Sequence, residues 1–99
     1  MEINSNVRNT MILYGFDFLL KGTSYIYEMV LEMANNFSFR TGSKLMQYIS
    51  DKHDIKLKSM NRAVRWAIFN ATKRGETFNT AISTKILIKK IYNAALINC

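Results

Sequence analysis

The sequence predicts an all-α fold, a compact bundle of about six helices that contains a helix-turn-helix. The chain has no proline and four glycines, so few residues interrupt a helix. Apolar residues recur at the three- and four-residue spacing of amphipathic helices, and no alternating strand pattern lasts long enough to compete. The 99 residues, 48% hydrophobic and 21% charged, are expected to form one domain, 1–99, around one core.

The first two helices are bracketed by small and polar residues. A helix is expected over 7–14, where Gly15 ends it. The second helix is capped by Thr23 or Ser24 and runs to Ala34. Its expected inner face holds Tyr25 or Ile26, together with Met29, Val30 and Met33.

The next two helices have the spacing of a helix-turn-helix. One is expected over 43–52 and the other over 57–74, separated by a polar break at His53-Asp54. A connection of about four residues is typical of this motif, here over 43–74, although any helical bundle has short turns.

The last part of the chain is expected to hold two further helical segments. Gly75 is placed to end the preceding helix in the left-handed conformation. A short turn of helix is expected over 78–82, and the final helix over 84–96.

The helix over 57–74 has two chemically distinct faces. At 100° per residue, small and medium apolar residues share one stripe, namely Met60, Ala63, Val64, Ala67, Ile68 and Ala71. The opposite side carries Lys58, Arg62, Arg65 and Lys73. Small residues allow close approach to a neighbouring helix, and the cations then point away from the core, where a phosphate or a guanine edge could meet them. This is the pattern of a recognition helix.

Positive charge is concentrated in the middle of the chain. The total net charge is +7, and residues 40–75 hold nine Lys or Arg against two Asp, a net charge of +7. Residues 1–39 carry −2 and residues 76–99 carry +2. A positive patch of this kind is typical of a nucleic-acid footprint. The alternative is a solvated basic face with no partner.

Several function classes are not supported by the composition. The single cysteine, Cys99, cannot form an internal disulfide, which favours a reducing cytoplasm. No apolar run reaches the length of a membrane span. His53 beside Asp54 lacks a second histidine or a paired acid, and the chain holds no glycine-rich phosphate loop. We therefore expect neither an enzyme nor a metal site.

Two aromatic residues, Trp66 and Phe69, fall outside the buried stripe of the 57–74 helix. Such side chains either pack under another helix, for which the last helix is the candidate, or form part of a dimer contact. Ser59 and Asn61 lie near the start of the same helix, where they could contact bases or, for Ser59, cap the helix.

Two segments of the chain resemble a known family. The first segment, Lys21-Gly22-Thr-Ser-Tyr25-Ile26-Tyr-Glu28-Met-Val30, is similar to the family's pattern Lys-Gly-x-x-Tyr-Leu-x-Glu-x-Ile. The second segment, Met60-Asn-Arg62-Ala63-Val64-Arg65-Trp-Ala67-Ile68, is similar to the family's pattern Val-Glu-Arg-Ala-Ile-Arg-His-Ala-Ile. The family is the C-terminal DNA-binding domain of the master sporulation response regulator (stage-zero sporulation protein A) of spore-forming Firmicutes. The resemblance covers about residues 11–76.

The resemblance implies a six-helix bundle that binds a short DNA box in the major groove. In the family, phosphorylation of a preceding receiver domain promotes dimerisation, and these 99 residues hold no receiver domain. Arg62 and Arg65 are retained, whereas Ser59 stands where the family has arginine and Asn61 where it has glutamate. The fold is expected to transfer, but the preferred DNA sequence need not.

The sequence therefore predicts a sequence-specific transcriptional regulator of the bacterial cytoplasm that binds double-stranded DNA without a cofactor, as a homodimer by analogy with the family. The expected base-reading residues are Ser59, Asn61, Arg62 and Arg65. The expected phosphate contacts are Lys44, Lys56, Lys58 and Lys73. The alternative is a protein-interaction module that binds a full-length sporulation regulator or another protein.

Overall fold

The structure, a computed structural model, describes residues 3–35, 42–75 and 78–97. These residues form five helices and no strand. The helices are α1 (Ile3–Leu13), α2 (Lys21–Asn35), α3 (Gly42–Lys52), α4 (Leu57–Arg74) and α5 (Thr84–Ile97). The all-α prediction is confirmed. Cys99 lies outside the described residues.

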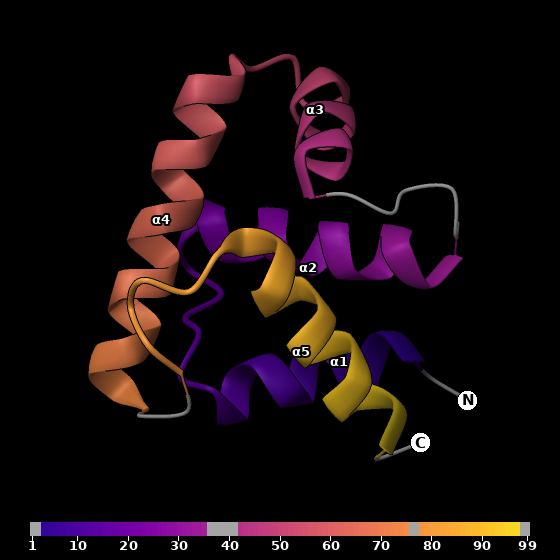
Figure 1. Cartoon of the computed structure of the whole chain (residues 1–99), viewed down its shortest axis with the longest axis vertical. Helices are drawn as coiled ribbons and strands as arrows, with labels where there is room; N and C mark the ends of the chain where they lie inside the picture. The colour runs from indigo at the N-terminus through magenta and orange to yellow at the C-terminus, as the bar shows by residue number, and fades with distance from the viewer. Residues whose placement is uncertain (1–2, 36–41, 76–77, 98–99) are drawn as a thin grey trace.

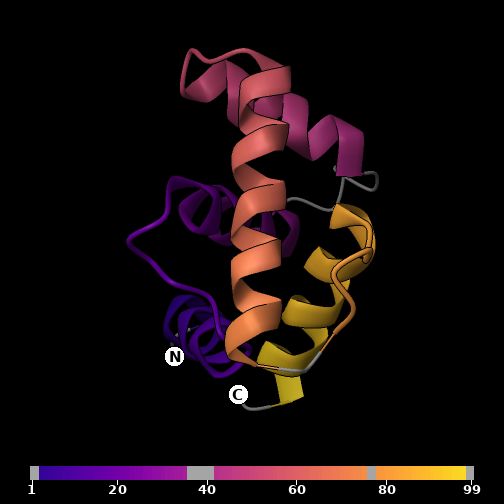
Figure 2. The same cartoon turned by 90° about the vertical axis from the view of Figure 1, so that its left-hand side faces the viewer.

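The five helices are arranged around α2, which crosses the middle of the molecule between α3 above and α1 and α5 below (Figure 1). The most extensive helix–helix contact joins α2 to α4, and the next joins α1 to α5. Figure 2 shows α4 at the front of the molecule, running along most of its height with no other helix in front of it. The core between the helices is apolar, and its largest fully buried side chains come from all five of them.

The predicted buried stripe of α4 is confirmed. Met60, Val64, Ala67, Ile68 and Ala71 are fully buried, and Ala63 is half-buried. The small residues of this stripe permit close contact with α2 at Gly22. A Cβ atom on Gly22 would clash with the backbone carbonyl oxygen of Ala63 and would lie 3.0 Å from the Cβ of Ala67. The position of α4 therefore depends on the absence of a side chain at Gly22.

The expected end of the first helix at Gly15 is confirmed. Gly15 has φ +97° and donates its N–H to the carbonyl of Ile12, while Phe16 donates to the carbonyl of Met11. These two bonds make a Schellman motif, in which the left-handed residue favours glycine. Met11 and Phe16 are both buried, which supplies the apolar contact that commonly accompanies the motif.

The expected cap of the second helix is wrong, and Gly75 ends α4 as expected but in a different conformation. The second helix begins at Lys21, so Thr23 lies inside it, fully buried, with no hydrogen-bond partner for its hydroxyl among the described residues. Gly75 ends α4 in an extended conformation, with φ −149° and ψ 140°. Its N–H still bonds to the carbonyl of Ala71, and Gly75 itself lies against the end of α1, where a Cβ atom on it would be 3.1 Å from the carbonyl oxygen of Tyr14.

The expected short helix over 78–82 does not form. Asn79 accepts the N–H of Ala81 on its side-chain oxygen and the N–H of Ile82 on its carbonyl, which closes a turn. Side-chain bonds of this kind compete with helical ones. The residues that the structure describes therefore form five helices, where six were expected.

Candidate nucleic-acid interface

The connection between α3 and α4 is a tight turn over residues 53–56. Asp54 has φ +52° and donates its N–H to the carbonyl of Asp51, while Ile55 donates to the carbonyl of Ser50. This is a second Schellman motif, and it ends α3 at Lys52, directly before His53. Asp tolerates the left-handed conformation better than most residues, because its short polar side chain can bond locally. The expected polar break between the two helices is confirmed.

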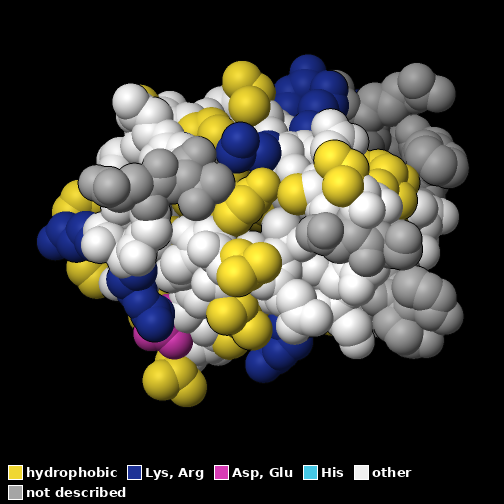
Figure 3. All heavy atoms as spheres, turned by 90° about the horizontal axis from the view of Figure 1, so that it is seen from below, with side chains coloured by type: hydrophobic (Ala, Val, Ile, Leu, Met, Phe, Trp, Pro, Cys, Tyr) yellow, Lys and Arg dark blue, Asp and Glu magenta, His cyan; other side chains and the backbone are white. Residues whose placement is uncertain are grey.

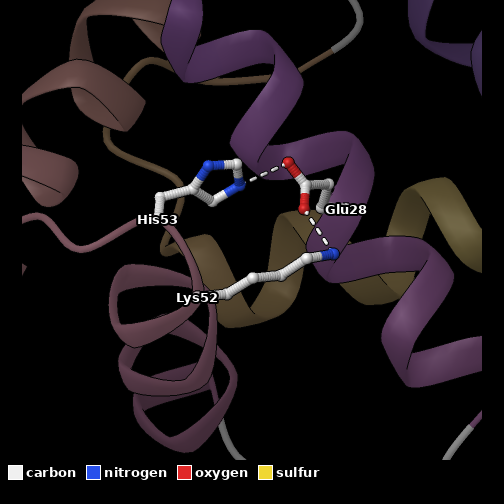
Figure 4. Close-up of polar contacts among 3 residues, drawn as sticks. All are labelled: Glu28, Lys52 and His53. Carbon is white, nitrogen blue, oxygen red and sulfur yellow. Dashed lines mark hydrogen bonds and ion pairs between the residues drawn. The ribbon is translucent and has the colours of Figure 1, made fainter.

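The turn is also tied to α2 by a cluster of three charged or titratable side chains (Figure 4). Glu28 of α2 accepts a contact of 2.7 Å from His53 Nε2 on Oε2 and one of 3.1 Å from Lys52 Nζ on Oε1. The ring of Tyr25 meets the ring of His53 edge-on, with centroids 5.2 Å apart. The hydrogen bond to Glu28 and its negative charge raise the pKa of Lys52.

Sequence reasoning missed this cluster and treated His53 as an isolated loop residue. Glu28 lies 25 residues before His53, and no local spacing links them. The cluster holds one carboxylate shared between an imidazole and an ammonium, and the described residues contain no group of three His, Cys, Asp or Glu that could hold a metal. Its evident effect is to fix the end of α3 against α2.

The N-terminal half of the uncovered α4 face is cationic and polar. The side chains of Lys58, Asn61 and Arg62 are exposed and make no hydrogen bond or ion pair with any described residue. Lys56 precedes the helix and is exposed as well. The helix carries no Asp or Glu at any position. These side chains are therefore available to an anionic partner.

Ser59 lies on this half of the helix and is exposed. The residue at the N-cap position is Lys56, which makes no side-chain cap bond. The alternative in which Ser59 caps the helix is thus not what the structure shows. Lys44 of α3 is also exposed, on the other helix of the pair.

Arg65 has a different role from its neighbour Arg62. Its guanidinium donates two hydrogen bonds, of 2.7 Å to the carbonyl oxygen of Ile82 and 2.6 Å to that of Thr80. Both acceptors belong to the turn before α5, and the side chain is half-buried. Because these bonds occupy the guanidinium on the chain's own backbone, Arg65 does not fit the predicted base-reading role. It anchors the segment that leads into α5.

The aromatic pair of α4 is exposed. Trp66 is 56% exposed and Phe69 is 37% exposed, with ring centroids 5.8 Å apart. The Nζ of Lys73 lies 4.5 Å from the centroid of the Phe69 ring, which places this cation against the aromatic pair. The interpretation in which the last helix covers both rings is wrong, since large parts of both stay accessible.

A second exposed surface lies on α1 and α5. Figure 3 views the molecule from below, where these two helices lie, and hydrophobic side chains run across the middle of that face with lysine and arginine side chains around them. The exposed large apolar residues of the two helices are Ile12, Leu13, Ile86, Leu96 and Ile97. The sequence analysis did not single these residues out.

No family model, curated protein or solved structure matches this chain in comparisons with known proteins. The resemblance to the sporulation regulator domain therefore rests on the quoted motifs alone. None of the five described helices is long and apolar enough to cross a membrane.

Proposed function

We propose that this protein is a sequence-specific regulator that binds double-stranded DNA. In this proposal α4 lies in the major groove and α3 contacts the phosphate backbone of the DNA. The observation that carries the proposal is the outward pair of Lys58 and Arg62, unpaired among the described residues, on a helix whose opposite stripe is buried. A guanidinium can contact guanine O6 and N7 with two parallel bonds, and an ammonium can neutralise a phosphate. The two helices and their four-residue turn would form the helix-turn-helix.

The proposed contacts follow from which polar and cationic side chains of the two helices are exposed. Ser59, Asn61 and Arg62 would face the bases, because recognition helices read through residues near their N-terminus. Lys44, Lys56 and Lys58 would contact phosphates. Arg65 is left out of the contact set, because its two hydrogen bonds to carbonyl oxygens hold its guanidinium against the turn before α5.

A salt titration of binding to random duplex DNA tests the proposal. Counterion release makes the logarithm of the affinity fall linearly with the logarithm of the salt concentration, by about 0.9 for each phosphate contacted. A steep fall is expected. The absence of binding at about 50 mM salt would contradict the proposal.

Arg62 is tested with a matched control on another helix. Arg62→Ala should weaken binding to a selected site by about 1–3 kcal/mol and relax the base preference at one position. Lys89→Ala removes an exposed cation from α5 and should leave the base preference unchanged. Equal effects of the two substitutions would remove Arg62 from the base-reading set.

A second candidate function is a protein-interaction module, with a full-length sporulation regulator as one candidate partner. The exposed apolar residues of α1 and α5 favour it, because hydrophobic side chains gathered on one face commonly mark a protein contact (Figure 3). The same surface could join two copies of the chain on DNA. Leu13→Asn, at a side chain 77% exposed, should then weaken self-association in sedimentation experiments. An unchanged monomer–dimer equilibrium would remove this surface from the dimer contact.

A further inference from the structure

The outward face of α4 changes character along its length. Its N-terminal half presents the polar and cationic residues described above, and its C-terminal half presents Trp66 and Phe69. Arg62, Trp66 and Phe69 follow one another at intervals of four and three residues. At 3.6 residues per turn they lie within an arc of roughly 60° and span about 10 Å along the axis. The aromatic pair therefore continues the surface that contains Arg62.

The spacing of these residues suits a helix that lies along a groove. The reading helix of homeodomains, for example, contacts the major groove through side chains at positions i, i+3, i+4 and i+7. Counted from Arg62, these positions are Arg65, Trp66 and Phe69. The guanidinium of Arg65 is hydrogen-bonded to the turn before α5. Trp66 and Phe69 are the two remaining positions, and both are accessible.

The charge around the aromatic pair indicates the chemistry of its partner. Arg62 and Lys73 flank it, and α4 has no acidic residue. A second copy docking through the same face would bring these cations together, which is unfavourable. The partner that fits is a polyanion that also offers small apolar groups. The major groove of DNA has this combination, because the thymine C5-methyl group projects into it between two rows of phosphates.

We propose that Trp66 and Phe69 contact thymine methyl groups next to the base pair that Arg62 contacts, so that the preferred DNA site carries thymine there. This inference rests on the proposed function and adds an apolar component to it. Methyl contact gives specificity without hydrogen bonds, and it is one of the ways in which a T·A pair is distinguished in the major groove.

The test removes the methyl groups from the DNA one at a time. A site is first selected from random duplexes with the wild-type protein, and each thymine is then replaced by deoxyuridine. Wild-type affinity should fall about fourfold at one or two positions, the effect of one buried methyl group. Trp66→Ala should bind the thymine site more weakly and should no longer distinguish uracil from thymine there. Leu19→Ala, which truncates a side chain that is 92% exposed in the connection between α1 and α2, should keep the wild-type response.

A spectroscopic readout is independent of the variants. Trp66 is the single tryptophan of the chain, so its fluorescence reports on this surface directly. Binding to the selected site should change its emission, and the change should be smaller for the uracil-substituted site.

The outcomes separate this inference from the proposed function. Tight, salt-dependent binding with no response to any uracil substitution would overturn the methyl contact and leave the DNA-binding proposal standing. Failure to select any site would overturn the DNA-binding proposal and this inference with it. If Trp66→Ala bound both sites like the wild type but lost a protein partner, the aromatic pair would be a protein-docking surface and the inference would be wrong.

Discussion

The outward face of α4 and the exposed face of α1 and α5 are both accessible, but they offer different chemistry. The first carries cations that make no ion pair with any described residue, next to an aromatic pair. The second carries aliphatic side chains, among them Leu13 and Ile97, which are 77% and 82% exposed. Binding through the first should weaken with salt, since exposed charges are screened, whereas apolar burial is not weakened in this way. Salt dependence therefore distinguishes the two surfaces in solution.

The largest expected effect is a loss of folding stability, which would disrupt both surfaces together. Gly22→Ala should lower the free energy of unfolding by about 3 kcal/mol or more, because the added methyl group meets the backbone of Ala63, which cannot move aside as a side chain can. Chemical denaturation followed by circular dichroism measures it. Lys21→Ala, at an exposed neighbour on the same helix, should stay within about 0.5 kcal/mol of the wild type. Similar values for the two variants would mean that α2 and α4 are not in backbone contact.

A smaller effect separates the two arginines of α4. Arg65→Ala should destabilise the protein by about 1–3 kcal/mol, because it removes charge-assisted bonds to two carbonyl groups and loosens the turn before α5. Arg62→Ala should change the free energy of unfolding by less than about 0.5 kcal/mol, since it breaks no bond to a described residue. Denaturation of both variants measures the difference, and the reverse order would contradict the assigned roles.

The smallest effect concerns the attachment of α3 to α2. Lys52→Met removes the contact with Glu28 and should reduce stability slightly at neutral pH. The raised pKa of Lys52 means that the contact stabilises the folded state fully below pH 10.5 and less as the pH rises through the higher folded-state value. Thermal melts of both proteins from pH 8 to above pH 10.5 should show the difference between wild type and variant shrinking with pH. A constant difference would mean that the charge of Lys52 does not matter.

Features that depend on local spacing were predictable from the sequence. The bounds of α4 and its buried stripe follow from one apolar period, and Gly15 could be identified as a helix end from its place after an apolar segment. Contacts between residues far apart in the sequence could not be predicted in this way. The acceptors of Arg65 lie 15 and 17 residues away, and Glu28 lies 25 residues before His53.

The candidate interface was predictable as a helix face but not as a set of contacts. Helical periodicity placed Arg62 and Arg65 on the same side, and only the turn before α5 makes them different. The conformation of this turn depends on Asn79. Its hydrogen bonds with the N–H groups of Ala81 and Ile82 form in place of the short helix that the apolar spacing suggested. The exposure of Trp66 was one of two open alternatives, because the sequence does not fix whether α5 covers it.

The most direct measurement compares the salt dependence of DNA binding for Lys58→Ala and Lys89→Ala, two single-charge removals on α4 and α5. If α4 lies on the DNA, Lys58→Ala should reduce the slope of log affinity against log salt by about one. Lys89→Ala should keep the wild-type slope. An unchanged slope for Lys58→Ala, or an equal reduction in both variants, would contradict the placement of α4 against the DNA.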